Sequence, residues 1–559
     1  MKQRVRTLQA VFLLCFLAVF VKLFYWQVID RKRLKTLAAQ QYYTSGEFPA
    51  SRGKMFTSDN FPLVLNTPAY LLFANPQQLE ISPFVLAEKL QDFINLENLD
   101  FEGLANKELL WLPLAKKLNE ENKKSIEELK IKGLGFEEEE ARFYPEASMS
   151  AHLLGFVGED DLGRPKGYFG LEGYYDNEIR GKPGGRFYEK DALGQPIPLS
   201  EGVEEKAIAG RNLFLNLDRA VQFVAEKKLQ EALEKYGSPS GSVLVMDPQN
   251  GAVLAMASLP AYNPAFYYLY ESDFYRNPVI SSAFEPGSIF KPLVMAAAIE
   301  TKAVALGERC PKCSGPRQIY DCSIETWNEQ YYPDSTMTEI LVHSDNVGMV
   351  YVAEKLGADR FYEYLRKFGF GEKTDIDLQG EIIPILREKG GWREIDLATA
   401  SFGQGIAVTP IQLLTAICAI ANGGELYQPQ VVRKIFEDQH SITVEPQRKK
   451  RPLSSKTAEV VTQMMVKAVE KGEAKWVKPA GYKIAGKTGT AQIPIAGHYD
   501  PEKTIASFVG FAPAEDPRFA MLVTLREPQT SSWGSETAAP LWFEIAQEIF
   551  RLWQIAPEN

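Results

Sequence analysis

An apolar run close to the N-terminus constrains this chain more than any other feature. Lys22 is the only charged residue between Leu8 and Ile29. A helix of about 20 apolar residues crosses the roughly 30 Å hydrocarbon layer of a bilayer, and a lysine near one end can extend to the interface. A cleaved signal peptide is the alternative, but the KLFYWQVID that follows lacks the small residues of a cleavage site. We therefore predict a short tail at residues 1–7 and an uncleaved anchor at residues 8–29.

The rest of the chain has the composition of a folded domain protein. Its 559 residues leave room for several domains, and its net charge of −10 argues against nucleic-acid binding. Three of the five cysteines cluster in CPKCSGPRQIYDC. No histidine lies beside them to complete a zinc site, so we expect no metal, and a short disulfide loop suits an exported domain. We predict a bond between Cys313 and Cys322, which leaves Cys310 unexplained.

Two regions with different patterns follow the anchor. Residues 30–205 mix short β-like runs with acidic helical pieces and a glycine-rich stretch, which is typical of a scaffold. From residue 206 onward the pattern tightens: Asp218 is a helix N-cap candidate before RAVQFVAEKKLQEALEKY, and DPQNG joins two strand-like runs. Helices that bracket consecutive strands predict a mixed α/β (α+β) domain, residues 206–559, with a central antiparallel sheet covered by helices.

Three short strings carry the chemistry of the second region. They are SIFK at Ser288–Lys291, SDN at Ser344–Asn346 and KTG at Lys487–Gly489. Each is weak alone, because SxxK also occurs at Ser51–Lys54 and SDN at Ser58–Asn60. The early pair lies too close together to leave room for the elements of a site, and SRGK begins no apolar helix. We interpret the early copies as coincidence.

The surroundings of SIFK suit a nucleophile. Pro286 and Gly287 form a turn, Ser288 begins an apolar helix, and Lys291 lies one turn later on the same face. A serine hydroxyl needs a base to remove its proton, and a lysine serves only when neutral. Lowering a lysine pKa from about 10.4 to about 7–8 corresponds to roughly 3–5 kcal/mol. Burial beside apolar residues, or a second cation such as Lys487, would favour the neutral amine.

The other two strings suit the same reaction. Thr336 and Glu339 form a capping box that would present SDN at the end of a helix, where Ser344 could move a proton and the Asn346 amide could hold a peptide bond. KTG lies in a strand-like run. There Lys487 offers a cation for a substrate carboxylate, Thr488 a hydroxyl and Gly489 close backbone approach, and the Thr490 N–H is a candidate oxyanion donor.

A Ser-His-Asp site was the chemical alternative. The chain has only four histidines, and no GxSxG elbow surrounds any serine. His343 is next to Ser344, but one neighbour does not make a triad. Lysine is therefore the better candidate base.

The strings in this order, with NLFLNLDRAVQ, SFGQGIAVTPIQL and GKTGTAQ, resemble the transpeptidase domain of the class B penicillin-binding proteins. Upstream, RFYPE, HLLGFVG and GLEGYYDNEIRG resemble the non-catalytic pedestal (dimerisation-type) domain of that family. The resemblance implies a serine D-Ala-D-Ala transpeptidase that cross-links peptidoglycan stem peptides and binds β-lactams covalently, without a cofactor. It also implies the roles of eight residues: Ser288 as nucleophile, Lys291 as base, Ser344 and Asn346 as assistants, and Lys487, Thr488, Gly489 and Thr490 on the substrate strand.

The resemblance also implies a cellular setting. It places a single-pass anchor in the cytoplasmic membrane, the tail in the cytoplasm and the catalytic domain outside. The C-terminal ending and WREIDLATASFGQG look closest to division-type members, which partner a polytopic membrane glycosyltransferase and other division proteins. Elongation-type members are the alternative.

Two further alternatives concern the activity itself. A D,D-carboxypeptidase or β-lactamase would need a water-activating glutamate, and we find none convincingly placed between SDN and KTG. A scaffold or β-lactam sensor would carry a decayed site, but all three strings are present.

Overall fold

The computed structural model divides the chain into two compact units. One unit comprises Met1–Arg52 and Arg180–Gly210, and the other comprises Gly53–Ile179 and Arg211–Asn559. The structure describes residues 2–35, 43–96, 99–189, 203–437, 440–495 and 498–557. The proposed domain boundary at residue 205 follows a stretch, 190–202, that lies outside the described residues.

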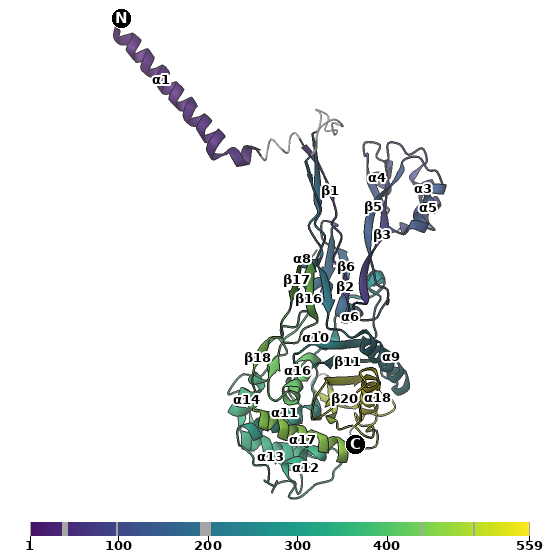
Figure 1. The fold of residues 1–559 in the computed structure, drawn as a ribbon, viewed down its shortest axis with the longest axis vertical. Coiled ribbons are helices and arrows are strands. Elements are labelled where there is room, and N and C mark those ends of the chain that lie inside the picture. Colours follow the sequence, from purple (N-terminus) through teal and green to yellow (C-terminus); the bar gives the residue numbers. More distant parts are fainter. Residues whose placement is uncertain are drawn as a thin grey trace. The chain divides into compact units, whose positions relative to one another are not determined.

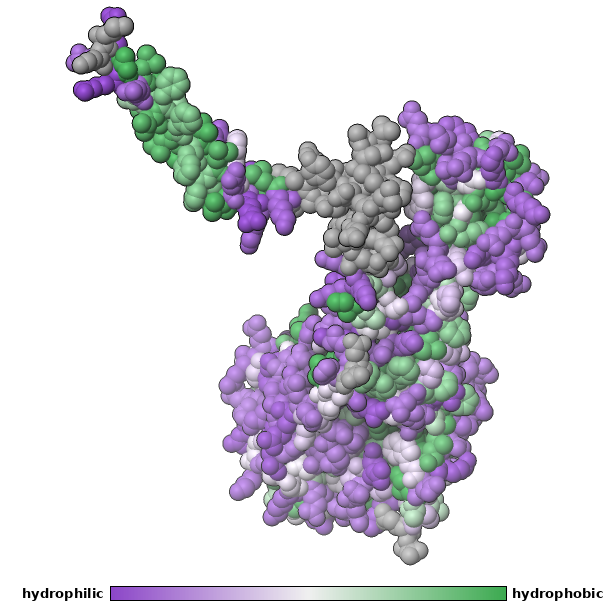
Figure 2. Space-filling view, turned by 45° about the horizontal axis from the view of Figure 1, so that its top comes forward, coloured by the Kyte–Doolittle hydropathy of each residue, from purple (hydrophilic) through white to green (hydrophobic). Residues whose placement is uncertain are grey.

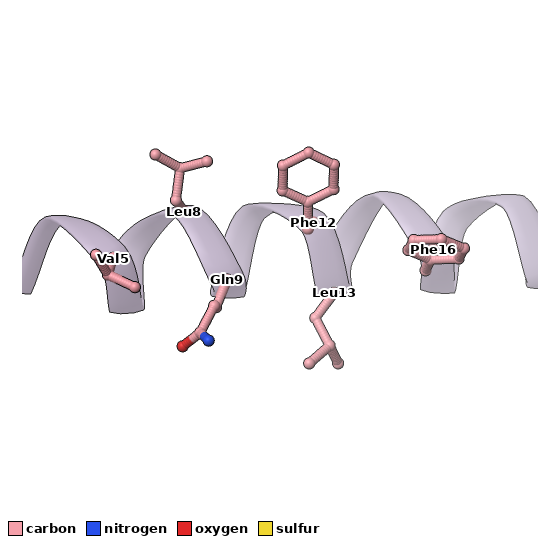
Figure 3. A pocket seen from close by; sticks show the side chains of 6 residues that line it. All are labelled: Val5, Leu8, Gln9, Phe12, Leu13 and Phe16. Carbon is pink, nitrogen blue, oxygen red and sulfur yellow. The ribbon is translucent and has the colours of Figure 1, made fainter.

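The first unit contains the predicted anchor. Helix α1 (Lys2–Phe24) continues through a turn of π-helix at Tyr25–Ile29. Gln3–Ile29 is long and apolar enough to cross a membrane, and none of its hydrophobic window is buried. Figure 2 shows hydrophobic side chains along most of this helix, and Figure 3 shows Leu8, Phe12 and Leu13 projecting from different sides of it. Apolar groups all around a helix suit a lipid surrounding better than a one-sided protein contact.

The unit also contains a small antiparallel sheet. Its order is β1-β8-β9, formed by Tyr43–Phe48, Gly184–Glu189 and Val203–Glu205.

The second unit begins with a long mixed sheet. Its order is β17-β16-β10-β2-β3-β4, and β5 also pairs with β3. The strands are β2 (Met55–Phe56), β3 (Pro62–Ala74), β4 (Leu112–Leu118), β5 (Leu134–Phe143), β10 (Asn212–Leu215), β16 (Val432–Glu437) and β17 (His440–Thr443). Helices α3 (Pro83–Leu90), α4 (Phe101–Ala105) and α5 (Glu120–Glu128) enclose a separate hydrophobic core with β3–β5.

A five-stranded antiparallel sheet organises the C-terminal part of this unit. Its order is β12-β11-β21-β20-β19, so β19 is an edge strand. The strands are β11 (Ser240–Met246), β12 (Val253–Leu259), β19 (Ala485–Ile495), β20 (His498–Ala512) and β21 (Phe519–Arg526). The pairing β11–β12 is the strand pair that the turn DPQNG indicates, and β20 pairs with β21 in the same antiparallel way.

Helices cover both faces of this sheet. Helices α9 (Arg219–Tyr236) and α18 (Ala538–Leu552) pack together on one face, as Figure 1 shows, around the buried Trp542. Helix α16 (Pro410–Ala421) contributes to the other hydrophobic core. The predicted mixed α/β fold with a helix-covered antiparallel sheet is confirmed.

Local capping chemistry fixes several helix ends in this domain. The Asp218 side chain accepts hydrogen bonds from Ala220 N and Val221 N at the start of α9, and Gly237 ends that helix in the left-handed conformation. Thr336 and Glu339 form the expected capping box of α12 (Met337–Val342). These ends follow from the sequence because each cap satisfies backbone groups within one turn.

Candidate active site

Ser288 lies at a tight turn before a buried helix. The turn Gly287–Phe290 is 3₁₀, and the α-helix α11 (Lys291–Glu300) begins only at the lysine. The sequence predicted that Ser288 would begin the α-helix, so the prediction was one turn too early. Pro292 lies in the first turn of α11, where its missing N–H leaves no hydrogen bond unmade.

Glycines allow this turn to pack closely. Gly287 has φ +58°, and Gly403, with φ +83°, lies against it. A Cβ on Gly403 would lie 2.2 Å from the carbonyl oxygen of Gly287. Only a glycine at position 403 therefore fits beneath the turn that holds Ser288.

Lys291 is completely buried, and its amine faces the SDN segment. The Nζ atom lies 2.6 Å from Ser344 O, 2.8 Å from Asn346 Oδ1 and 3.2 Å from Ser344 Oγ. Burial lowers the pKa of Lys291 well below its ordinary value, and the charge of Lys487 lowers it further. The carboxylates of Asp345 and Glu473 act in the opposite direction. Burial and the second cation are the two causes that the sequence suggested.

Ser344 links this lysine to the candidate nucleophile. A hydrogen bond of 3.0 Å joins Ser344 Oγ to Ser288 Oγ. Within the part of the chain that the structure describes, no hydrogen bond joins Lys291 directly to Ser288. Ser344 has φ +54°, a strained conformation for a residue with a side chain, which turns the chain between α12 and α13 (Asn346–Leu356). The contacts therefore run from the Lys291 amine through the Ser344 hydroxyl to the Ser288 hydroxyl.

The remaining SDN residues position this junction. Asp345 caps α13 by accepting from Gly348 N at 3.0 Å, and burial raises its pKa. Its second oxygen, Oδ2, is buried and has no hydrogen-bond partner among the described residues. Asn346 Nδ2 donates to Glu325 O at 3.0 Å, which fixes the amide orientation so that its oxygen faces Lys291.

Strand β19 brings KTG to the same site. Lys487 is 4% exposed, and its Nζ lies 3.1 Å from Thr488 Oγ1 and 3.2 Å from Thr488 O. Burial lowers the pKa of Lys487. A Cβ on Gly489 would lie 2.9 Å from Ile289, the residue after Ser288, so this glycine allows the strand to approach. Thr490 Oγ1 accepts a hydrogen bond of 2.9 Å from Gly534 N.

One cleft collects these residues. Trp327 and Trp533 form an edge-on pair, with ring centroids 5.1 Å apart, in its wall. The cleft is lined by Gly287, Ser288, Trp327, Ser344, Asn346, Phe402, Gln404, Glu473, Thr488, Gly489, Thr490 and Trp533. All three predicted strings therefore meet, although Lys291 and Lys487 lie buried behind the surface.

Sequence reasoning missed Glu473, which lies between SDN and KTG in the chain. Its Oε2 accepts a hydrogen bond of 2.8 Å from Thr488 Oγ1, and its side chain lines the cleft. The sequence pointed to no glutamate of this interval as a water-activating group, and it gave no sign that Glu473 lines the cleft. No local pattern around KGEAK marks the residue, because its position depends on how two distant helix ends pack.

The early copies of the motifs lie elsewhere. Lys54 directly precedes β2, and Ser58–Asn60 form the turn between β2 and β3, where Asn60 has φ +66°. Of the described residues, none from either copy lines the cleft. The interpretation of these strings as coincidence agrees with this placement.

The predicted disulfide was wrong. Cys310 is bonded to Cys313, and Cys322 is free and exposed. Cys322 lies on the short strand β14 (Cys322–Ile324), which pairs with β13 (Arg317–Ile319) in a hairpin. The two bonded cysteines are buried in the core beside α13, so the pairing follows the core and not the longer loop.

Comparison with known protein families agrees with the geometry. The penicillin binding protein transpeptidase domain model matches residues 241–551, and the penicillin-binding protein dimerisation domain model matches residues 47–215. The chain belongs to the class B penicillin-binding proteins. This penicillin-binding protein is a serine D-Ala-D-Ala transpeptidase of peptidoglycan synthesis.

Relatives of this penicillin-binding protein match it along nearly its whole length. Stage V sporulation protein D of Bacillus subtilis is 33% identical over 95% of this chain and 83% of its own length. Peptidoglycan D,D-transpeptidase FtsI of Escherichia coli is 30% identical over 94% of this chain and 86% of its own.

Solved structures share the fold. Penicillin binding protein 2X of Streptococcus thermophilus superposes with a TM-score of 0.74 at 24% identity, over 91% of this chain and 80% of that one. Penicillin binding protein 3 of Mycobacterium tuberculosis, complexed with aztreonam, gives 0.71 at 25% identity over 92% and 98%.

Proposed function

We propose that Ser288 is the nucleophile of the transpeptidase and that Lys291 removes its proton through Ser344. The observation that carries this proposal is the continuous set of contacts from the buried Lys291 amine through Ser344 Oγ to Ser288 Oγ. A neutral Lys291 can donate to Ser344 O and Asn346 Oδ1 and still offer its lone pair to the Ser344 hydroxyl. The proton of Ser288 then passes to Ser344 while the Ser344 proton passes to the amine.

The reaction proceeds in two acyl transfers. Ser288 Oγ attacks the carbonyl carbon between the two D-alanines, and the protonated Lys291 returns a proton through Ser344 to the leaving D-alanine amine. The resulting ester holds the stem peptide on Ser288. A stem-peptide amine from a neighbouring strand attacks that ester, loses a proton along the same route and restores the Ser288 hydroxyl. In the first transfer Ser288 gives up its proton to Lys291 through Ser344, and in the second transfer Ser288 regains a proton along the same route.

Strand β19 supplies the other half of the site. We assign Lys487 and Thr488 to the terminal carboxylate of the donor peptide, because the Thr488 hydroxyl lines the cleft and the buried Lys487 amine lies 3.1 Å behind it. Backbone N–H groups of Ser288 and Thr490 are the candidate oxyanion donors, and each such donor is typically worth about 2.7–4 kcal/mol. Gly489 keeps the strand close enough to the 3₁₀ turn for both to reach one carbonyl.

The same geometry accounts for covalent binding of β-lactams. A β-lactam presents a strained amide and a nearby anionic group, and the relative from Mycobacterium tuberculosis was solved with aztreonam. The test is mass spectrometry of the protein after reaction with penicillin, followed by localisation of the adduct. We expect one adduct, on Ser288, and none in Ser288→Ala. An adduct on another serine would overturn the site assignment.

Hydrolysis is the second candidate activity, and Glu473 is the observation that favours it. A carboxylate in the cleft could activate a water against the acyl-enzyme. Its hydrogen bond from Thr488 Oγ1 places it on the carboxylate side of the site, so we favour transpeptidation. Fluorescent penicillin distinguishes the two: a transpeptidase holds the label for hours, whereas a β-lactamase releases it within seconds to minutes.

For the cellular role we propose septal cell-wall synthesis, with residues 8–29 as a single cytoplasmic-membrane anchor, 30–205 as the pedestal and 206–559 as an extracytoplasmic transpeptidase domain. The resemblance of the C-terminal region to division-type members supports this role. A polytopic membrane glycosyltransferase and other division proteins would be the partners.

The setting can be tested by localising a fluorescent fusion. We expect it at division sites. Uniform lateral localisation would favour the elongation role, and localisation only in sporulating cells would favour the role named in Stage V sporulation protein D.

A further inference from the structure

The end of helix α17 delivers a carboxylate into the active-site cleft. Helix α17 (Ser455–Lys471) ends at Gly472, and Glu473 follows directly. A Cβ on Gly472 would lie 2.3 Å from Ala468 O and 2.9 Å from Val342 O. Position 472 therefore packs tightly against Val342, the last residue of α12, two residues before Ser344. This packing places the next side chain between SDN and β19.

Glu473 contacts the carboxylate-binding end of the site. Its Oε2 accepts from Thr488 Oγ1 at 2.8 Å, and the same Thr488 oxygen lies 3.1 Å from Lys487 Nζ. The threonine hydroxyl thus donates to the glutamate and accepts from the lysine. A hydroxyl has one proton, so the bond to Glu473 fixes which way it points.

Glu473 also acts on both lysines of the site. Four charged groups from four segments act here: Lys291 from α11, Asp345 from the α12–α13 junction, Glu473 after α17 and Lys487 on β19. Burial lowers the pKa of each lysine, and the Glu473 charge raises it in both cases. Among the described residues, Glu473 is the charged group that opposes the effect of burial on the pKa of Lys487.

We propose that Glu473 is a positioning residue of the transpeptidase: it orients the Thr488 hydroxyl and keeps the Lys487 amine charged for the carboxylate of the donor peptide. This inference rests on the proposed function of the cleft. A buried lysine without a nearby carboxylate tends to lose its proton. A neutral Lys487 would bind an anionic substrate group far more weakly.

Replacing Glu473 by glutamine should lower the pKa of Lys487. Glu473→Gln keeps the size and the hydrogen-bond acceptor but removes the charge. The pKa of Lys487 then falls further, so its ammonium is lost at a lower pH than in the wild type. A carboxylate within a few ångströms typically moves such a pKa by about 1–3 units. As the pH rises, the Glu473→Gln variant should therefore lose its preference for anionic ligands at a pH about one unit or more below that of the wild type.

The test compares two ligands that differ in one charge. The full-length protein in detergent is acylated with benzylpenicillin or with its methyl ester between pH 6 and 9.5, and the ratio of second-order rate constants measures carboxylate recognition. Glu470→Gln is the matched control, because Glu470 lies on α17 and pairs with Lys478 at 3.6 Å. Thermal denaturation checks that each variant is folded.

We expect the ratio for Glu473→Gln to fall by up to about tenfold for each unit of pKa lost, most strongly at the alkaline end of the range, while Glu470→Gln follows the wild type. The pH at which the ratio is halved should move down by about one unit. A ratio with the wild-type pH dependence would overturn the inference. A higher ratio would also overturn it, because Glu473 would then be a competitor of the substrate carboxylate.

Glu473→Asp decides the case if the glutamine variant does not fold. Aspartate keeps the charge but is one methylene shorter, so it should lose the bond to Thr488 while the pH dependence of the ratio stays near that of the wild type. Identical rates and ratios for Glu473→Asp and the wild type would refute the orienting role. A wild type that is not acylated at Ser288 would instead overturn the proposed function and, with it, this assignment.

Discussion

Replacing Ser344 by alanine separates a relayed proton transfer from a direct one. The Ser344 hydroxyl lies 3.0 Å from Ser288 Oγ and 3.2 Å from Lys291 Nζ, and it is the only bridge between them among the described residues. A positioned acid–base group contributes about 10²–10⁴-fold, which is about 2.7–5.4 kcal/mol in the barrier. We expect Ser344→Ala to slow acylation by that factor.

Stability should change much less than the rate. Alanine pays the same conformational cost at φ +54° as serine, and Lys291 keeps its bonds to Ser344 O and Asn346 Oδ1. The loss is one hydrogen-bonding hydroxyl, about 0.5–1.5 kcal/mol in the free energy of unfolding. A large loss of rate with a small loss of stability therefore identifies a chemical role.

The assay is the second-order rate constant for fluorescent penicillin at pH 7.5, measured beside chemical denaturation. Ser281→Ala is the control, because the half-buried Ser281 also loses one hydrogen bond, 2.7 Å to Asn277 O, but does not line the cleft. Acylation of Ser344→Ala within threefold of the wild type would refute the relay. It would mean that Lys291 reaches Ser288 directly.

Three further outcomes follow from the described contacts. Burial lowers the pKa of His152 to about 4 from 6.5, so the unfolded chain binds a proton that the folded chain does not between these pH values. Stability should fall by up to about 3 kcal/mol as the pH drops through this window, and chemical denaturation at pH 7 and 4.5 should show a smaller drop for His152→Gln. Gly403→Ala forces a Cβ into a carbonyl oxygen at 2.2 Å, and should cost about 2 kcal/mol or more in thermal stability and most of the acylation rate; unchanged acylation would contradict the account of the turn. Maleimide labelling of unreduced, denatured protein followed by peptide mapping should modify Cys322 and leave Cys310 and Cys313 linked, whereas a labelled Cys310 would contradict the assigned bond.

Local chemistry explains what the sequence predicted correctly. The cap at Asp218 and the capping box at Thr336 and Glu339 each act within one turn, so their residues reveal them. The strands around DPQNG pair because a short turn joins them. The three strings of the site are each weak alone, so local context was needed to choose SIFK and SDN over their early copies, and the order of the strings carried the resemblance to the family.

Long-range packing explains what the sequence did not reveal. One-turn spacing suggested that Lys291 faces Ser288, but the 3₁₀ turn and the burial of the amine direct it to Ser344 from another segment. Glu473 enters the site only because Gly472 packs against the end of α12. Cys310 is bonded to Cys313 because the β13–β14 hairpin holds Cys322 at the surface, and the sequence did not reveal this exposure.

The edge position of β19 has a consequence for what the enzyme can discriminate. An extended peptide that lies along this strand can join the sheet by main-chain hydrogen bonds, which read no side chain. Alternate side chains of such a guest would point to opposite sides, one toward the enzyme and the next toward solvent. The enzyme would then tolerate variation of the stem peptide at every second residue. It would select side chains only at the inward-facing positions near the paired tryptophans.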